Sequence, residues 1–189
     1  MAVHVIHENL EWTQPLFDEL AKTQTPYVDM DMSDWSVDLM ASAPAGIFYN
    51  RMSASSHTRG HRYAPEMTSA LLSWLEASDA TVLNGSHALR LELNKAVQYG
   101  ALQQAGLSVP DTIVCQNAAD ILAAFDKLSP LPVITKHNRA GKGLGVKLFH
   151  DRPALDAYVH GAEFDPSVDG LTLVQRYIEA PKPQITRLE

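Results

Sequence analysis

The sequence predicts an α/β protein in two units, a parallel sheet covered by helices and then an α+β unit. Over residues 1–84, short apolar runs rich in β-branched residues alternate with stretches of helical periodicity, the pattern of a parallel sheet with helices on both faces. A long helical stretch follows, and beyond it strands and helices no longer alternate in this way. The 189 residues are 46% hydrophobic and 20% charged, a composition sufficient for one large core or two small ones.

The first unit begins with a strand and a helix. The strands are short apolar runs, and the helices carry apolar residues three or four positions apart. We expect strands at 2–7, 27–32, 46–50 and 81–83, and helices at 10–22 and 63–78.

The second unit begins with one long helix at 86–105, which ends before Gly106. Asn117 is a typical N-cap residue, and Pro153 suits the first turn of a helix. We expect strands at 112–116, 132–136, 146–150 and 171–178, and further helices at 118–128 and 152–164. This places the domain boundary between residues 84 and 85, giving domains 1–84 and 85–189.

Charge and cysteine content exclude several classes of protein. The formal net charge of −7 argues against a partner such as nucleic acid, whose phosphates require a basic face. The one cysteine, Cys115, lies in a β-branched run that favours a buried structural thiol. No apolar stretch has the length of a membrane span, and the first residues lack the features of a secretory signal. We therefore expect a cytoplasmic protein with no membrane partner.

A glycine-rich segment carries the strongest chemical signal. A predicted strand ends in Lys136, and a loop with Arg139, Lys142 and three alternate glycines leads into the next strand. Exposed amides in such a loop can bind phosphate oxygens, and Lys136 adds a positive charge from a rigid strand end. The Walker pattern is absent, because no Gly-Lys-Ser/Thr occurs at the required spacing. A β-hairpin with a solvated glycine-rich tip remains the alternative interpretation.

An ordered set of segments accompanies this loop. Asn94-Lys95 comes first, then 105–110, then 133–136 with its loop, and finally 173–178. In this order and spacing the set resembles the ATP-grasp superfamily, in particular the RimK-type glutamate ligases. The resemblance implies a Rossmann-like pre-ATP-grasp domain followed by the α+β nucleotide-lid subdomain. It also implies that the chain is truncated at the hinge and that the C-terminal catalytic subdomain is largely absent.

The resemblance further implies a nucleotide site for ATP. Lys95 and Lys136 would contact phosphates, the 139–145 loop would close over them, and Gln175 would lie beside the adenine. Backbone groups of Tyr177 and Ile178 would read the adenine edge, and Glu179 would accept from a ribose hydroxyl. Lys95 as a solvated helix residue and Glu179 as a surface glutamate remain alternatives. The complete set of cofactor-binding candidates is Lys95, Lys136, Arg139, Gly141, Lys142, Gly143, Gly145, Gln175, Tyr177, Ile178 and Glu179.

A polar loop follows the predicted strand at 46–50, where open α/β sheets usually bind ligands. Asn50, Arg51 and Arg59 could hold a substrate carboxylate or contact phosphates. A polar connection that caps the next helix is an equal alternative. His57 and His61 have no nearby glutamate to complete a zinc motif, so we predict no metal site in this chain.

The resemblance implies a reaction for the parent protein, a carboxylate–amine ligase that forms an acyl phosphate and releases ADP and phosphate. Its Mg²⁺ ligands would lie downstream of the hinge, Arg187 would face the reacting groups, and a homo-oligomer could cover exposed surface. Small-molecule or peptide carboxylates and amines would be the partners, and the chain alone would be a poor catalyst. One alternative is a non-catalytic nucleotide- or ligand-binding module. Another, a dinucleotide enzyme, is disfavoured because the turn at 7–10 has no glycine.

Overall fold

The computed structural model describes residues 1–130, 132–141 and 143–180. The chain forms two compact units, Met1–Gln98 and Tyr99–Glu189. The division therefore falls later than the boundary that we placed at residue 84. The reason is that Leu89, in the helix that follows residue 85, is 3% exposed and belongs to the core of the first unit.

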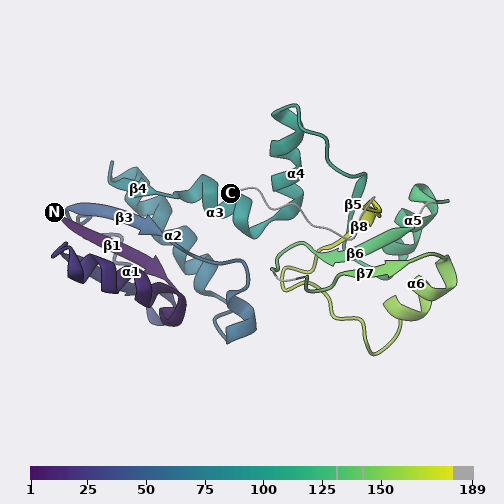
Figure 1. The fold of residues 1–189 in the computed structure, drawn as a ribbon, viewed down its shortest axis with the longest axis horizontal. Helices are drawn as coiled ribbons and strands as arrows, with labels where there is room; N and C mark the ends of the chain where they lie inside the picture. The colour runs from purple at the N-terminus through teal and green to yellow at the C-terminus, as the bar shows by residue number, and fades with distance from the viewer. Residues whose placement is uncertain (131, 142, 181–189) are drawn as a thin grey trace. The chain divides into compact units, whose positions relative to one another are not determined.

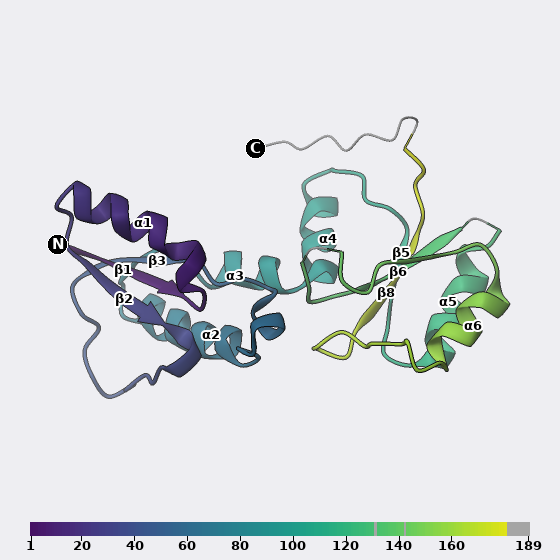
Figure 2. The same ribbon diagram turned by 60° about the horizontal axis from the view of Figure 1, so that its bottom comes forward.

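The first unit is built on a parallel sheet with the strand order β2-β1-β3-β4. Its strands are β1 (Ala2–His7), β2 (Tyr27–Asp31), β3 (Gly46–Asn50) and β4 (Thr81–Leu83). Helix α1 (Leu10–Lys22) covers one face and α2 (Ala64–Ala77) covers the other (Figure 2). Because the strands are parallel, the loops after β1, β3 and β4 leave from one edge of the sheet.

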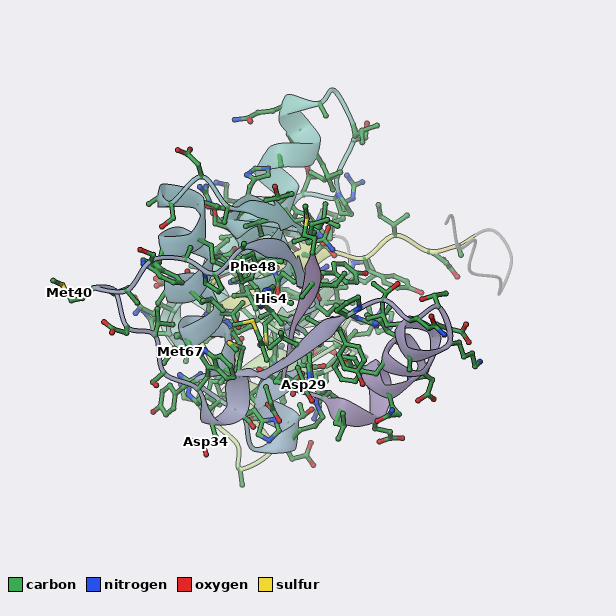
Figure 3. The ribbon with its side chains drawn as sticks, turned by 90° about the vertical axis from the view of Figure 1, so that its left-hand side faces the viewer. His4, Asp29, Asp34, Met40, Phe48 and Met67 are labelled. Atoms are coloured by element: carbon green, nitrogen blue, oxygen red, sulfur yellow. The ribbon has the colours of Figure 1, made fainter. Side chains whose placement is uncertain are left out.

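The core of this unit lies mainly between the sheet and α2. Phe48 of β3 and Leu72 and Leu75 of α2 are fully buried there. His4 of β1 stacks on Phe48, with 4.4 Å between ring centroids (Figure 3). Such burial removes apolar surface from water, which stabilises the sheet at about 25 cal/mol per Å².

The helix predicted over 86–105 is in fact two helices, α3 (Ser86–Leu93) and α4 (Lys95–Gln104). Asn94 separates them with an extended backbone, φ −141° and ψ 102°. Its side-chain oxygen accepts a hydrogen bond of 3.0 Å from the Val97 amide and so caps α4. The prediction was wrong because asparagine forms this local bond more readily than it continues a helix.

The second unit is built on an antiparallel sheet with the order β5-β8-β6-β7. Its strands are β5 (Thr112–Cys115), β6 (Val133–His137), β7 (Lys147–Phe149) and β8 (Thr172–Arg176). Helices α5 (Ala118–Leu128) and α6 (Arg152–Val159) lie side by side on one face (Figures 1 and 2). The last helix is shorter than the predicted 152–164, since His160 and Gly161 end it.

The two faces of this second sheet differ. Val133 and Val174 are fully buried in a core with residues of α5 and α6. Side chains alternate along a strand, so Ile134, Lys136 and Gln175 belong to the opposite face. The described residues include no helix that is long and apolar enough to span a membrane.

Candidate functional site

Lys136 lies near the end of β6 in a network of polar side chains. Its ammonium donates to the Gln175 side-chain oxygen at 2.9 Å and to the Tyr99 hydroxyl, and it lies 4.9 Å from the centre of the Tyr99 ring. The Gln175 amide nitrogen donates to Tyr99 at 3.0 Å and to the Thr112 hydroxyl at 2.8 Å. These contacts use two of the three N–H donors of Lys136. The ammonium is therefore held in place with one donor left for a ligand.

The partners of Lys136 are neutral. No carboxylate pairs with Lys136 among the residues that the structure describes. Gln175 is 4% exposed, so its hydrogen bonds are sheltered from water and define one orientation of the amide. The positive charge of Lys136 is consequently oriented without being neutralised.

The loop at 138–146 connects β6 to β7, and its first residues are anchored. Asn138 is fully buried, and its side-chain amide donates to Asp169 at 2.7 Å. The Arg139 amide donates to the Ser167 hydroxyl at 3.2 Å. Gly143 and Leu144, further along, are exposed. The loop therefore has a fixed base and an exposed tip, while Lys142 lies outside the described residues.

Gly145 is required by both backbone conformation and space. Its φ is +69°, in the left-handed region, and a Cβ there would lie 2.0 Å from Cδ2 of His137. His137 cannot easily move aside, because its Nε2 is 2.7 Å from the Asp165 carbonyl and the ring is buried. Gly143 also has a positive φ, +77°, but a Cβ there would meet open space. The hairpin thus depends on Gly145 more strongly than on Gly143.

The segment after β8 holds the three predicted adenine and ribose contacts. The Tyr177 amide donates to the Pro132 carbonyl at 2.9 Å, so this N–H is not available to an adenine. Ile178 and Glu179 are exposed. The roles proposed for these residues stay predictions, and Arg187 lies outside the described residues.

An apolar surface accompanies Lys136 on the face of the sheet opposite α5 and α6. The register places Leu148 opposite Ile134, and Val114 opposite Leu173. Val114 is 45% exposed and Leu148 is 42% exposed. A planar ring could pack on this apolar surface while an anionic group attached to the ring extends toward Lys136.

Lys95 is the first residue of α4, directly after the Asn94 cap. The amide dipoles at a helix N-terminus favour an anion, as does the lysine charge. Lys95 belongs to the first unit and Lys136 to the second. Their joint contact with one triphosphate stays a prediction.

In the first unit, Asn50 joins the ends of β3 and β4. Its side-chain amide donates to the Asn84 carbonyl at 2.8 Å, and its side-chain oxygen accepts from the Met52 amide at 2.9 Å. Asn84 returns a hydrogen bond of 3.3 Å to the Asn50 carbonyl. The Asn50 amide is therefore occupied, and its contribution is to shape the edge of the sheet.

A cavity of about 320 Å³ lies at this edge. Arg51 is exposed beside it, with its guanidinium 5.9 Å from the centre of the Tyr49 ring. The Arg51 amide donates to the Ile6 carbonyl at 2.8 Å, which fixes the backbone of this residue to β1. The cavity is lined by Tyr49, Asn50, Arg51, Met52, Asn84, Ala88, Leu89 and Glu92.

Arg59 does not line this cavity and is already paired. Its guanidinium donates to both carboxylate oxygens of Glu8 and to the Ser55 hydroxyl, and it lies 4.7 Å from the centre of the Trp12 ring system. Glu8 has a side chain only 1% exposed and also contacts His61. Arg59 is thus engaged by Glu8 and does not line the cavity beside Arg51, and its part in binding a substrate stays a prediction.

Asp31, the last residue of β2, has a lowered pKa. Burial tends to raise the pKa of this carboxyl, but hydrogen bonds from Ser33 and the charges of His7 and His61 hold the pKa below its ordinary value. Asp31 is therefore an anion at neutral pH.

No group of three or more His, Cys, Asp or Glu residues suited to a metal occurs in the described part of the chain.

The sequence did not predict four side chains that take part in these sites, namely Tyr99, Thr112, Glu92 and Glu8. Each is remote in sequence from its partner, and none belongs to a motif. Tyr99 alone had a usable signal, because it follows Lys95 by one helical turn.

No protein-family model and no curated protein sequence matches the chain. Solved structures do match. A RimK domain ATP-grasp protein from Sphaerobacter thermophilus superposes with a TM-score of 0.66 at 22% identity, over 96% of this chain and 65% of that one. D-alanyl-alanine synthetase A from Vibrio cholerae has a TM-score of 0.64 at 13% identity, over 94% of this chain and 59% of that one.

A further similar structure is the ATP-grasp ligase PsnB in complex with a minimal precursor, Mg and ADP. Its TM-score is 0.57 at 14% identity, over 94% of this chain and 65% of PsnB. The chain thus spans less than two thirds of the length of each of these proteins. These superpositions confirm the predicted resemblance at the level of the fold, which this chain shares with the solved ATP-grasp structures.

Proposed function

We propose that this chain is the ATP-binding portion of an ATP-dependent carboxylate–amine ligase. The observation that carries this proposal is the oriented, unneutralised ammonium of Lys136 at the base of a glycine-containing hairpin. Similar structures include ligases, one of them solved with ADP and Mg. A site of this kind suits a polyanion such as the phosphates of ATP.

Lys136 would stabilise negative charge as a phosphoryl group moves from ATP to a carboxylate, which yields an acyl phosphate and ADP. An oriented cation favours such a transfer because it needs no rearrangement when charge develops. Attack by an amine on the acyl phosphate would then release phosphate. The exposed tip of the 138–146 loop would cover the phosphates and exclude water.

The adenine would rest on the apolar surface around Ile134, Leu148 and Val114. Gln175 would act through Lys136, because its amide is engaged by Lys136, Tyr99 and Thr112. Mg²⁺ supplies charge neutralisation between phosphates when it is bound. We assign no described residue as its ligand, because Mg²⁺ prefers carboxylate oxygens and no cluster of such groups suited to a metal occurs among the described residues.

The test is calorimetric titration of ATP with Mg²⁺ into the chain and into its Lys136→Ala variant. We expect the variant to bind at least about tenfold more weakly, since a hydrogen bond to a charged group contributes about 1.5–3 kcal/mol. Lys127→Ala is the matched control, because Lys127 lies on α5 and so on the other side of the same sheet. Equal affinity of the Lys136→Ala variant and the wild type would refute the assignment.

A second measurement separates the ligase from a non-catalytic nucleotide-binding module. ADP release is measured with a panel of carboxylates and amines, in the chain and in the complete parent protein. Carboxylate-dependent ADP release that Lys136→Ala abolishes supports the ligase. Tight ATP binding without any turnover by the parent supports the module.

A further inference from the structure

The cavity at the ends of β3 and β4 contains one cationic and one anionic side chain, Arg51 and Glu92. Within the described part of the chain, neither forms an ion pair. The Glu92 carboxylate has one long contact, 3.5 Å from the Ala54 amide. Two opposite charges therefore line one cavity while neither is neutralised by a partner side chain.

Both charged groups stand on fixed backbone. Arg51 follows β3 directly, and its amide is bonded to β1. Glu92 lies on α3, whose first turn is capped by Glu76 through a 2.7 Å hydrogen bond to the Ser86 amide. Gly85 makes room for this cap, since a Cβ there would lie 2.3 Å from the Glu76 carboxylate. Charged groups on rigid elements are suited to binding a ligand in one orientation.

Two apolar residues that line the cavity, Met52 and Leu89, are 6% and 3% exposed, and two polar ones, Asn50 and Asn84, are joined by reciprocal hydrogen bonds. A simple anion would be attracted by Arg51 and repelled by Glu92, and a simple cation would meet the reverse. A ligand that carries both charges satisfies both side chains.

We infer that this cavity binds a small aminocarboxylate, with its carboxylate on Arg51 and its ammonium on Glu92. The inference rests on the proposed function, because such a compound contains both a carboxylate and an amine that a ligase could join. A cavity of about 320 Å³ has room for an amino acid with a side chain of moderate size.

The experiment is calorimetric titration of the full chain with glycine, L-alanine and L-glutamate, each compared with its N-acetyl and α-carboxamide derivatives. At least one free amino acid binds, and blocking either charge weakens its binding by about tenfold or more. In Glu92→Gln, the weakening caused by N-acetylation falls below about threefold. In Arg51→Gln, the weakening caused by amidation falls in the same way, because each variant removes the group that reads the blocked charge.

Glu11→Gln is the matched control, since Glu11 lies on α1, which covers the sheet from one face. In this variant, N-acetylation and amidation of the amino acid each weaken binding as much as they do in the wild type. The inference is overturned if no free amino acid binds at millimolar concentration, or if Glu92→Gln retains the full effect of N-acetylation. Circular dichroism confirms that each variant is folded before it is titrated.

A titration of Lys136→Ala separates this inference from the proposed function. Lys136→Ala weakens ATP binding and leaves amino acid binding unchanged, because Lys136 lies in the other unit. If Lys136→Ala leaves ATP affinity unchanged while N-acetylation and amidation still weaken amino acid binding, the nucleotide assignment fails and the aminocarboxylate site stands. If Lys136→Ala weakens ATP binding as proposed but N-acetylation and amidation have no effect on amino acid binding, only the aminocarboxylate site fails.

Discussion

Two basic residues, Arg59 of the first unit and Lys136 of the second, use their positive charge in opposite ways. In the first, Arg59 is paired with the carboxylate of Glu8, and His61 shares that same group. In the second, Lys136 is held by two neutral side chains, Tyr99 and Gln175. A neutralised charge stabilises a loop, whereas an oriented and unneutralised one can bind an anion. The partner of a basic residue, more than its presence, therefore indicates whether it serves the fold or a ligand.

We expect the largest effect, a loss of stability, when the ion pair between Arg59 and Glu8 is broken. Replacement Glu8→Ala removes a buried carboxylate and leaves Arg59 without its partner, which costs about 3–5 kcal/mol when a buried pair is broken. Urea unfolding measures the loss. Glu19→Ala is the control, since Glu19 pairs with Lys22 at an exposed site and should change stability little. A small loss for Glu8→Ala would show that the pair does not stabilise the loop.

A second prediction concerns the hairpin beside Lys136. Gly145→Ala introduces a left-handed alanine and a clash with His137, and we expect it to lower the free energy of unfolding by more than about 2 kcal/mol. Gly143→Ala shares the positive φ without the clash and should cost about 1 kcal/mol. Thermal unfolding of both variants checks the difference. Equal losses would mean that His137 yields to the new methyl group.

The variant Tyr99→Phe tests whether neutral side chains must orient Lys136 for it to bind ATP. This change keeps the ring and removes the hydroxyl that accepts from Lys136 and Gln175. Of the two hydrogen bonds that are lost, the one that orients Lys136 is worth about 1 kcal/mol, so ATP affinity should fall roughly fivefold. Titration of ATP measures it, with Tyr63→Phe as control because Tyr63 is exposed in the other unit. Unchanged affinity for Tyr99→Phe would show that Lys136 needs no such orientation.

The last prediction concerns the core beneath the Lys136 face and leaves both proposed sites unchanged. Burial, assisted by the charge of Asp120, raises the pKa of the Cys115 thiol to about 11. At pH 8 its thiolate fraction is then roughly a hundredfold below that of an ordinary thiol, so alkylation by iodoacetamide should be slow. Mass spectrometry of native and urea-unfolded chain compares the rates. Rapid modification of the native chain would contradict the packing of β5 against α5.

Local sequence patterns predicted the strands and helices well where the spacing of apolar residues was clear. The strands at 2–7 and 46–50 were predicted with the bounds that the structure has, because short apolar runs between turns have few other interpretations. The helix at 86–105 was mispredicted at one residue, since Asn94 acts as a cap only in the context of its neighbours. Lys136 and the glycines after it were visible in the sequence because strand, charge and turn are all local features.

The sequence by itself determined where the strands and helices form, where the glycine turn lies, and that Lys136 stands at a strand end. Only the tertiary structure decided which groups those charges meet. Gln175 reaches Lys136 because β8 pairs with β6 in one antiparallel register, and Glu8 reaches Arg59 because the parallel sheet brings two loops to the same edge. Periodicity and turn propensity act over a few residues, whereas strand register and packing act across the whole chain, so the second kind of information is absent from any local motif.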